Sequence, residues 1–138
     1  MPEFLYHYRK RRNSICDIFG YREIVQYWES HLKRYNDLID KYPQCSFRLT
    51  ERCFEAASRF WFYISECSAE EKAKAKPLMA EMKSFAKEHA DVQDGMCAYS
   101  GTMKLLKLFN WSENPLFLKL LTVYNNHRYD QYRKVMYD

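Results

Sequence analysis

The residues best suited to chemistry lie at the start of the chain. Tyr6 and Tyr8 are followed by four consecutive cations at residues 9–12, and then by a Ser–Ile step at residues 14 and 15. Guanidinium groups form paired hydrogen bonds with phosphate oxygens, and cations also stack on aromatic rings. The stretch therefore has the residue types needed to hold phosphate groups and to stack on rings. The candidate site residues are Tyr6, Tyr8, Arg9, Arg11, Arg12 and Ser14.

The charge of the whole chain argues against nucleic acid as the partner. The 138 residues carry 22 Lys and Arg against 18 Asp and Glu, a net charge of +4. This excess is below what a dedicated nucleic-acid-binding domain shows, and the four cations at residues 9–12 account for it alone. On composition alone, the alternative is that the cations at residues 9–12 are solvent-exposed charges without a binding role.

The remaining reactive residues do not form a recognisable catalytic or metal motif. The four histidines are far apart, no D-x-D occurs, and three glycines supply no phosphate-binding loop. The five cysteines are odd in number and none is in a C-x-x-C pair, which predicts reduced, partly buried thiols rather than disulfides or a zinc site. We expect neither a catalytic residue nor a cofactor in this chain.

Hydrophobic periodicity predicts long helices, because only three Gly and four Pro interrupt the chain. The first helix begins near Gly20 and ends before Pro43. Its apolar stripe consists of Ile24, Trp28, Leu32, Tyr35, Ile39 and Tyr42. The second helix, with Ser46 as its N-cap, is apolar around most of its circumference and should be the central one.

Further helices follow with weaker signals. Ser68 and Glu71 form a predicted capping box, and Pro77 predicts a kink or break near residues 74–76. We expect a loop at residues 91–95, and then a fourth helix over residues 96–110 with Met103, Leu106 and Phe109 inward. Ser112 should cap a fifth helix that has Pro115 in its first turn and frays after Tyr132. The predicted face of this helix is Phe117, Leu120, Leu121 and Tyr124.

These elements predict an all-α fold, a compact antiparallel bundle of about five helices preceded by a short extended basic N-terminal arm. The expected organisation is an extended Tyr- and Arg-rich segment at residues 1–19 and a helical domain at residues 20–138. No apolar run approaches the roughly 20 residues needed to span a bilayer, so we expect a cytoplasmic location. Exposed Tyr and Trp near cations leave peripheral binding to the inner face of the cell membrane as an alternative.

The pattern Leu5-Tyr6-x-Tyr8-Arg9-x-Arg11-Arg12-x-Ser14-Ile15 resembles the segment that follows the catalytic domain in bacterial family 2 glycosyltransferases. These inverting enzymes build capsules, exopolysaccharides and lipopolysaccharide, and a variable helical tail follows the segment. The match covers about a tenth of the chain. The family's nucleotide-binding strand, D-x-D metal motif and acidic base have no counterpart here. The resemblance therefore implies a C-terminal accessory region, inactive alone, of a longer transferase.

The resemblance also implies partners for the intact enzyme. These are its own N-terminal catalytic domain, a nucleotide sugar, and a glycan or lipid-linked acceptor, with Mg or Mn held by the catalytic domain. Arg9 and Arg12 would face phosphate oxygens of the donor or acceptor, or else form salt bridges with the catalytic domain. Packing against a second copy of the chain stays open. The rival interpretation is a free-standing helical protein-interaction module with a basic arm.

Overall fold

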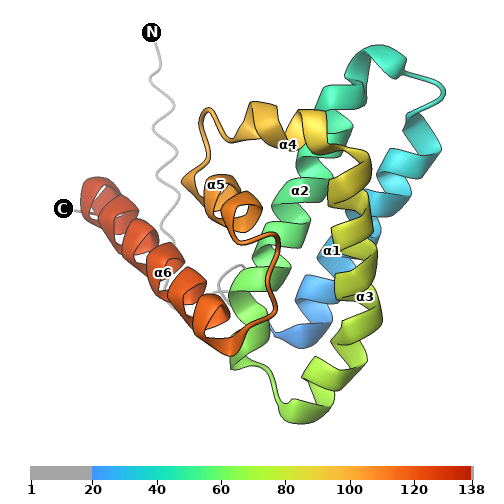
Figure 1. Cartoon of the computed structure of the whole chain (residues 1–138). Helices are drawn as coiled ribbons and strands as arrows, with labels where there is room; N and C mark the ends of the chain where they lie inside the picture. The colour runs from blue at the N-terminus through green and yellow to red at the C-terminus, as the bar shows by residue number, and fades with distance from the viewer. Residues whose placement is uncertain (1–19, 138) are drawn as a thin grey trace, which may run out of the picture.

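The computed structural model describes residues 20–137, and this part of the chain is all-α, as predicted (Figure 1). Six α-helices, rather than about five, follow one another. They are α1 (Tyr21–Leu38), α2 (Ser46–Tyr63), α3 (Ala69–Glu88), α4 (Ala90–Met96), α5 (Gly101–Leu108) and α6 (Pro115–Tyr137). Two short 3-10 turns, η1 (Pro43–Cys45) and η2 (Ile64–Glu66), flank α2. The predicted extended arm at residues 1–19 lies outside the described residues.

Helices α1, α2 and α3 run alternately in opposite directions beside one another (Figure 1). The first part of the predicted stripe of α1 is confirmed, because Ile24 and Trp28 are fully buried. Its end is wrong, because the helix stops at Leu38 and Tyr42 is 49% exposed. The indole N–H of Trp28 donates a hydrogen bond to the Glu81 carboxylate of α3 at 3.1 Å, and its ring meets Phe85 edge-on at 5.7 Å between centroids. Hence α1 contacts α3 as well as α2.

Helix α2 is the central element, as its apolar circumference predicted (Figure 1). Its sides carry large side chains that are fully buried, among them Phe54, Phe60 and Trp61. Phe54 packs against Phe85 of α3, and Trp61 packs edge-on against Trp111 with their ring centroids 5.1 Å apart. Cys45 rather than Ser46 is the N-cap of α2, so that prediction was wrong by one residue.

The start of α3 confirms the capping box. The Ser68 hydroxyl accepts from the Glu71 backbone N–H at 3.2 Å, and the Glu71 carboxylate accepts from the Ser68 N–H at 3.0 Å. Of the kink or break predicted near residues 74–76, the break is wrong, because α3 continues through Pro77. Proline leaves the Ala73 carbonyl without its helical partner. Ala73 and Pro77 are exposed, so water can reach this carbonyl.

The connection after α3 differs from the prediction. Residues 91–95, expected as a loop, lie in helix α4. Gln93 and Met96 are buried on one side of this short helix, and their burial holds it against the core. The expected helix over residues 96–110 begins only at Gly101. The Ser100 hydroxyl accepts from the Met103 N–H at 3.2 Å and thereby caps α5.

The end of α5 also differs. Asn110 and Trp111 both have left-handed backbone angles, with φ of 51° and 52°. This turn brings Trp111 into the core at 4% exposed, while Phe109, predicted to point inward, is 45% exposed. A left-handed conformation costs a bulky residue free energy, so burial of the indole must offset it.

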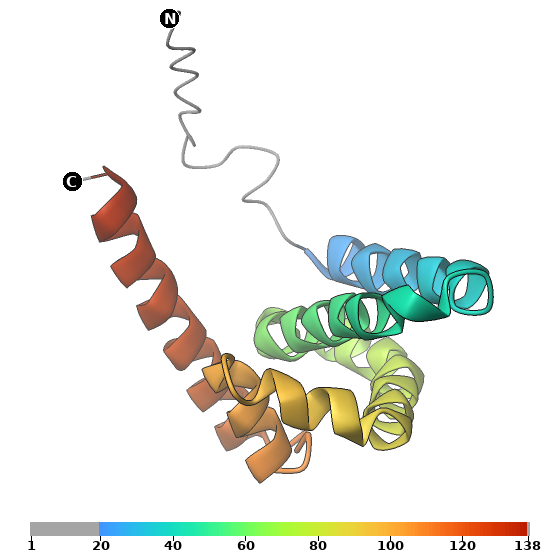
Figure 2. The same cartoon turned by 90° about the horizontal axis from the view of Figure 1, so that it is seen from above.

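Helix α6 begins at Pro115, and the Asn114 side chain, not Ser112, accepts the Leu116 N–H at 2.9 Å. Proline is in the first turn as predicted, and Phe117 and Leu121 are buried. Leu120 is 51% exposed, so its predicted inward position is wrong. The helix continues to Tyr137. Its C-terminal part extends away from the other helices (Figure 2).

A pair of leucines on α5 tests this core. Leu106 is fully buried, whereas Leu108, two residues later, is 76% exposed. We expect Leu106→Ala to lower the free energy of unfolding by about 2–5 kcal/mol, since it removes buried methyl groups and leaves a cavity. Leu108→Ala should change it by no more than about 0.5 kcal/mol. Urea denaturation followed by circular dichroism measures both, and equal losses would contradict the fold at α5.

Candidate functional site

All six residues predicted from the sequence as the site, Tyr6, Tyr8, Arg9, Arg11, Arg12 and Ser14, lie outside the described residues. Their proposed roles stay predictions. The described part of the chain offers three other surface features: a groove beside α6, an exposed apolar face on α5 and α6, and a cationic pocket between α1 and α2.

The groove lies between η2, the first half of α3 and the first half of α6, and has a volume of about 530 Å³. Its walls are mainly apolar. Ile64, Met79 and Leu118 are buried side chains that contribute to this lining, and Val123, which is 58% exposed, also lines it. The volume is within the range of about 300–1,000 Å³ that small-molecule sites occupy.

Charged side chains also line the groove. Lys72 and Lys76 come from α3, one helical turn apart, and Lys119 comes from α6. Within residues 20–137 none of the three lysines forms an ion pair. Of the two glutamates that line the groove, Glu113 binds Lys83 at 2.8 Å. The Glu66 carboxylate has no ion-pair partner among the described residues. The groove therefore holds three unpaired cations and one unpaired carboxylate.

A pair of hydroxyl groups completes the groove. Ser65 and Thr122 are 2.9 Å apart between their oxygens, and the Thr122 hydroxyl is within hydrogen-bond distance of the carbonyls of Phe62 and Leu118. Because each hydroxyl has one hydrogen, Thr122 donates to a carbonyl and accepts from Ser65. This arrangement joins η2 to α6 and fixes the width of the groove at that point.

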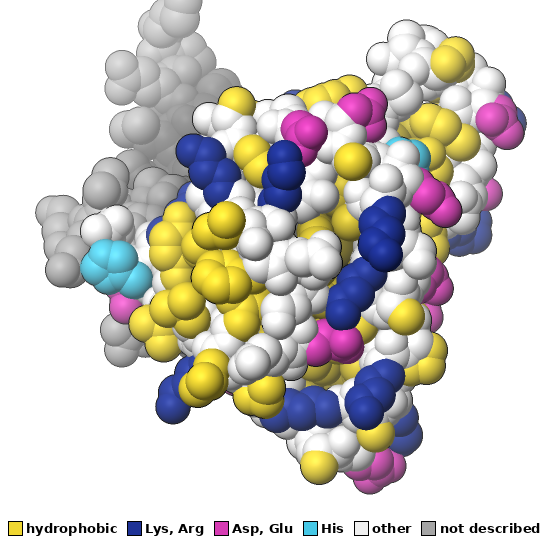
Figure 3. Space-filling view, in the orientation of Figure 1, with side chains coloured by type: hydrophobic (Ala, Val, Ile, Leu, Met, Phe, Trp, Pro, Cys, Tyr) yellow, Lys and Arg dark blue, Asp and Glu magenta, His cyan; other side chains and the backbone are white. Residues whose placement is uncertain are grey.

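The second feature is an exposed apolar face on α5 and α6. Hydrophobic side chains gather over these two helices on the surface that Figure 3 shows. Their exposed fractions are 76% for Leu108, 45% for Phe109, 78% for Leu116 and 51% for Leu120. The ring of Phe109 packs against Phe117 with centroids 4.7 Å apart. Contiguous apolar surface of this kind commonly marks a contact with another macromolecule.

The third feature is a pocket of about 340 Å³ between the end of α1 and the start of α2. Three arginines, Arg34, Arg48 and Arg52, line it together with Leu38, Leu49, Tyr42 and Cys45. Two of these cations are already neutralised, because Arg48 binds Glu51 at 2.5 Å and Arg52 binds Glu55 at 2.9 Å. This leaves Arg34 as the lining arginine without an ion pair in the described chain, which makes the pocket a weak site for anions.

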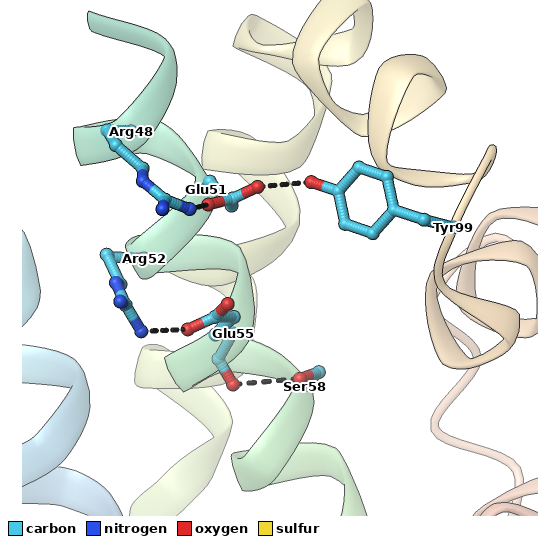
Figure 4. Close-up of polar contacts among 6 residues, drawn as sticks. All are labelled: Arg48, Glu51, Arg52, Glu55, Ser58 and Tyr99. Carbon is cyan, nitrogen blue, oxygen red and sulfur yellow. Dashed lines mark hydrogen bonds and ion pairs between the residues drawn. The ribbon is translucent and has the colours of Figure 1, made fainter. Parts of the chain in front are cut away.

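Glu51 organises a polar network beside this pocket (Figure 4). Its side chain is nearly buried and accepts hydrogen bonds from Arg48 and from the Tyr99 hydroxyl, which reaches it from the turn before α5. Burial opposes ionisation of Glu51, but these two hydrogen bonds and the charge of Arg48 lower its pKa below the ordinary value. Burial of the hydroxyl and its bond to Glu51 raise the pKa of Tyr99 to about 12. The network joins α2 to the α4–α5 turn.

Among residues 20–137 there is no group of three or more His, Cys, Asp or Glu side chains placed to hold a metal ion. In the same part of the chain, no helix has the length and hydrophobicity that a membrane crossing requires. Cys45, Cys53, Cys67 and Cys97 are free thiols, as the sequence predicted. Desolvation raises the pKa of the buried Cys53 thiol to about 12, and its Sγ lies 3.4 Å from the His31 carbonyl oxygen.

Sequence reasoning missed the groove because its lining comes from segments up to about sixty residues apart. One signal was present in the sequence: Lys72 and Lys76 share a helical face with Met79 in the polar first half of α3. It identifies a cationic face but does not indicate which apolar residues lie beside it.

No protein-family model, curated protein or solved structure matches the chain.

The network around Glu51 predicts a pH effect on stability. A carboxyl whose pKa is lowered by folding stabilises the protein above the unfolded-state pKa of about 4.3, and this contribution is lost as the pH falls through the lower folded-state pKa. Glu51→Gln should lower the free energy of unfolding at pH 7 by about 1–3 kcal/mol and reduce the loss of stability between about pH 5 and pH 3. Glu70→Gln is the control: this residue is 78% exposed and forms only a solvent-exposed ion pair with Lys74, so the substitution should change both quantities much less. Urea titrations across this pH range measure the free energy of unfolding of each variant. If Glu51→Gln loses as much stability on acidification as the unmodified chain, the network is contradicted.

The cysteines predict a graded reactivity. Cys45 is exposed, whereas Cys53 is fully buried with a raised pKa. Since the thiolate is the reactive form, a brief iodoacetamide pulse at pH 8 should label Cys45 in the native protein and Cys53 only in denaturant. Peptide mass spectrometry reads out both sites. Similar native labelling of the two cysteines would show that α2 is not packed as described.

Proposed function

We propose that this chain is the helical accessory region of a bacterial family 2 glycosyltransferase, which transfers a sugar from a nucleotide sugar to a surface-glycan acceptor. The observation that carries the proposal is the Tyr–Arg segment at residues 5–15, placed directly before an all-helical domain. The donor site, the general base and the Mg or Mn ion belong to a catalytic domain encoded upstream. Residues 20–137 then act by binding and positioning rather than by bond making.

In this proposal the N-terminal segment is the connection to the catalytic domain. Arg9, Arg11 and Arg12 contact either phosphate groups at the donor or acceptor cleft or carboxylates of the catalytic domain, and Tyr6, Tyr8 and Ser14 pack beside them. Guanidinium groups suit both roles, because they form paired hydrogen bonds with phosphate and with carboxylate. The resemblance favours neither contact over the other.

The exposed apolar face on α5 and α6 is the surface that we assign to the catalytic domain. A domain tethered through residues 1–19 is present at high effective concentration, so moderate apolar area suffices for docking. Leu108, Phe109, Leu116 and Leu120 together supply apolar side chains of the kind found at interdomain contacts. Docking on a membrane or on a second copy of the chain would use the same face.

The decisive test is the coding sequence upstream of Met1. We expect an open reading frame that continues into an α/β domain with a nucleotide-binding strand and a D-x-D motif. The protein from the complete frame should release nucleoside diphosphate from a nucleotide sugar in the presence of Mg or Mn, and the 138-residue chain alone should not. A gene that begins at Met1, giving a native protein of 16.8 kDa, would refute the proposal.

A substitution on the docking face gives an independent prediction. In the complete enzyme, Leu116→Lys with Leu120→Lys should reduce sugar transfer by about tenfold or more, because charges then replace an apolar contact between domains. In the 138-residue chain the same substitutions should change the free energy of unfolding by no more than about 1 kcal/mol, since both side chains are largely exposed.

Asn126→Lys, at an exposed position on the same helix, is the matched control and should leave sugar transfer unchanged. Full activity of the Leu116 and Leu120 variant would show that this face does not contact the catalytic domain. Equal damage from Asn126→Lys would point to an effect of added charge on α6 in general.

The second candidate is a free-standing helical interaction module. The same apolar face favours it, because a surface of this kind can bind a separate protein without any upstream domain. Under this alternative the native protein has the mass of the 138-residue chain and co-purifies with a partner that Leu116→Lys with Leu120→Lys releases. The upstream reading frame therefore separates the two candidates.

A further inference from the structure

The groove between η2, α3 and α6 shares no lining residue with the exposed face assigned to the catalytic domain. Apolar and cationic side chains make up most of its lining, and it is open to solvent on one side. Two properties restrict its occupant: the amount of apolar surface at its floor and the sign of the charge around it.

The floor requires an apolar group. Ile64 and Met79 are 2% and 3% exposed, and Leu118 is 8% exposed, so the ligand would contact side chains already held by the core. Pro115 and Val123 extend the wall along α6. A volume of about 530 Å³ is suited to one alkyl chain or a molecule of similar size, and is small for a peptide helix of 10–12 Å diameter.

The charge requires an anionic group. Lys72, Lys76 and Lys119 come from two helices, and no ion pair within residues 20–137 occupies them. Glu113 is bound to Lys83, which leaves Glu66 as one opposing carboxylate. A cationic N-terminal segment with Arg9–Arg12 would be repelled by this set of lysines, so residues 1–19 of the same chain are a poor occupant.

We propose that this groove binds a free single-chain anionic amphiphile, such as a fatty acid, with its alkyl chain against Ile64, Met79 and Leu118 and its anionic head beside the lysines. Lysine ammonium groups hold carboxylate or phosphate heads through charge-assisted hydrogen bonds. The Ser65 hydroxyl donates its hydrogen to Thr122, so the anionic head, which only accepts hydrogen bonds, is held by the lysines alone. The proposal does not depend on the glycosyltransferase assignment.

Isothermal titration of the full 138-residue chain tests the proposal, using decanoate below its critical micelle concentration. Decyl maltoside tests the alkyl chain without charge, and acetate tests the carboxylate without the chain. We expect decanoate to bind at least tenfold more tightly than decyl maltoside, and acetate to give no measurable heat. Amide NMR shifts should localise decanoate to residues 64–66, 72–79 and 115–123.

Two variants separate charge from apolar contact. Lys72→Ala with Lys76→Ala and Lys119→Ala should weaken decanoate about five- to tenfold and leave decyl maltoside unchanged, as expected for solvent-exposed ion pairs. Val123→Trp fills the groove from an exposed position and should weaken both ligands. Lys87→Ala, at the end of α3 and outside the groove, is the control.

Other outcomes would overturn the proposal. Equal affinities for decanoate and decyl maltoside would show that the lysines do not select an anion. Shifts confined to Leu116, Leu120 and α5 would place the alkyl chain on the exposed face instead. Sedimentation with phosphatidylglycerol vesicles in the absence of decanoate binding would show a membrane surface, not a free amphiphile, as the ligand.

Discussion

Helix α2 buries apolar side chains on nearly all of its sides, and this requirement determines where the other helices lie. Water must be excluded from Phe54, Phe60 and Trp61 in different directions at once, so one partner helix is not enough. Helix α1 covers one side, α3 another, and α4, α5 and the start of α6 the remainder (Figure 1). The groove forms next to the end of α2, where η2 lies between α3 and α6.

The first half of the fold could be predicted from the sequence because its signals are local and strong. The stripe of α1, the apolar circumference of α2 and the capping box of Ser68 and Glu71 each act within a few residues. The second half could not, because the tertiary contacts decide it. The left-handed turn at Asn110 and Trp111 contains no glycine, and it brings Trp111 rather than Phe109 into the core, against Phe54 and Trp61.

The same distinction separates the two kinds of site. The Tyr–Arg segment could be selected from the sequence because its residues are consecutive, and its role stays a prediction that concerns residues outside the described part. The groove could not be found in this way. It needs Ile64, Lys72 and Leu118 to meet, and nothing in the spacing of these residues along the chain indicates that they do. The sequence indicated part of the positive charge of the groove, at Lys72 and Lys76, but not the apolar side chains of its floor.

The edge-on contact of Trp61 and Trp111 has a spectroscopic consequence. Two indoles with centroids 5.1 Å apart and planes at 86° are close enough for their electronic transitions to couple. The asymmetric protein surroundings that hold both rings give the pair a circular dichroism signal. The chain therefore carries an internal reporter in the near ultraviolet. Its signal requires that the segment after α5 packs against α2. If that segment dissociates from α2, the near-ultraviolet signal is lost, whereas the helicity measured in the far ultraviolet can persist.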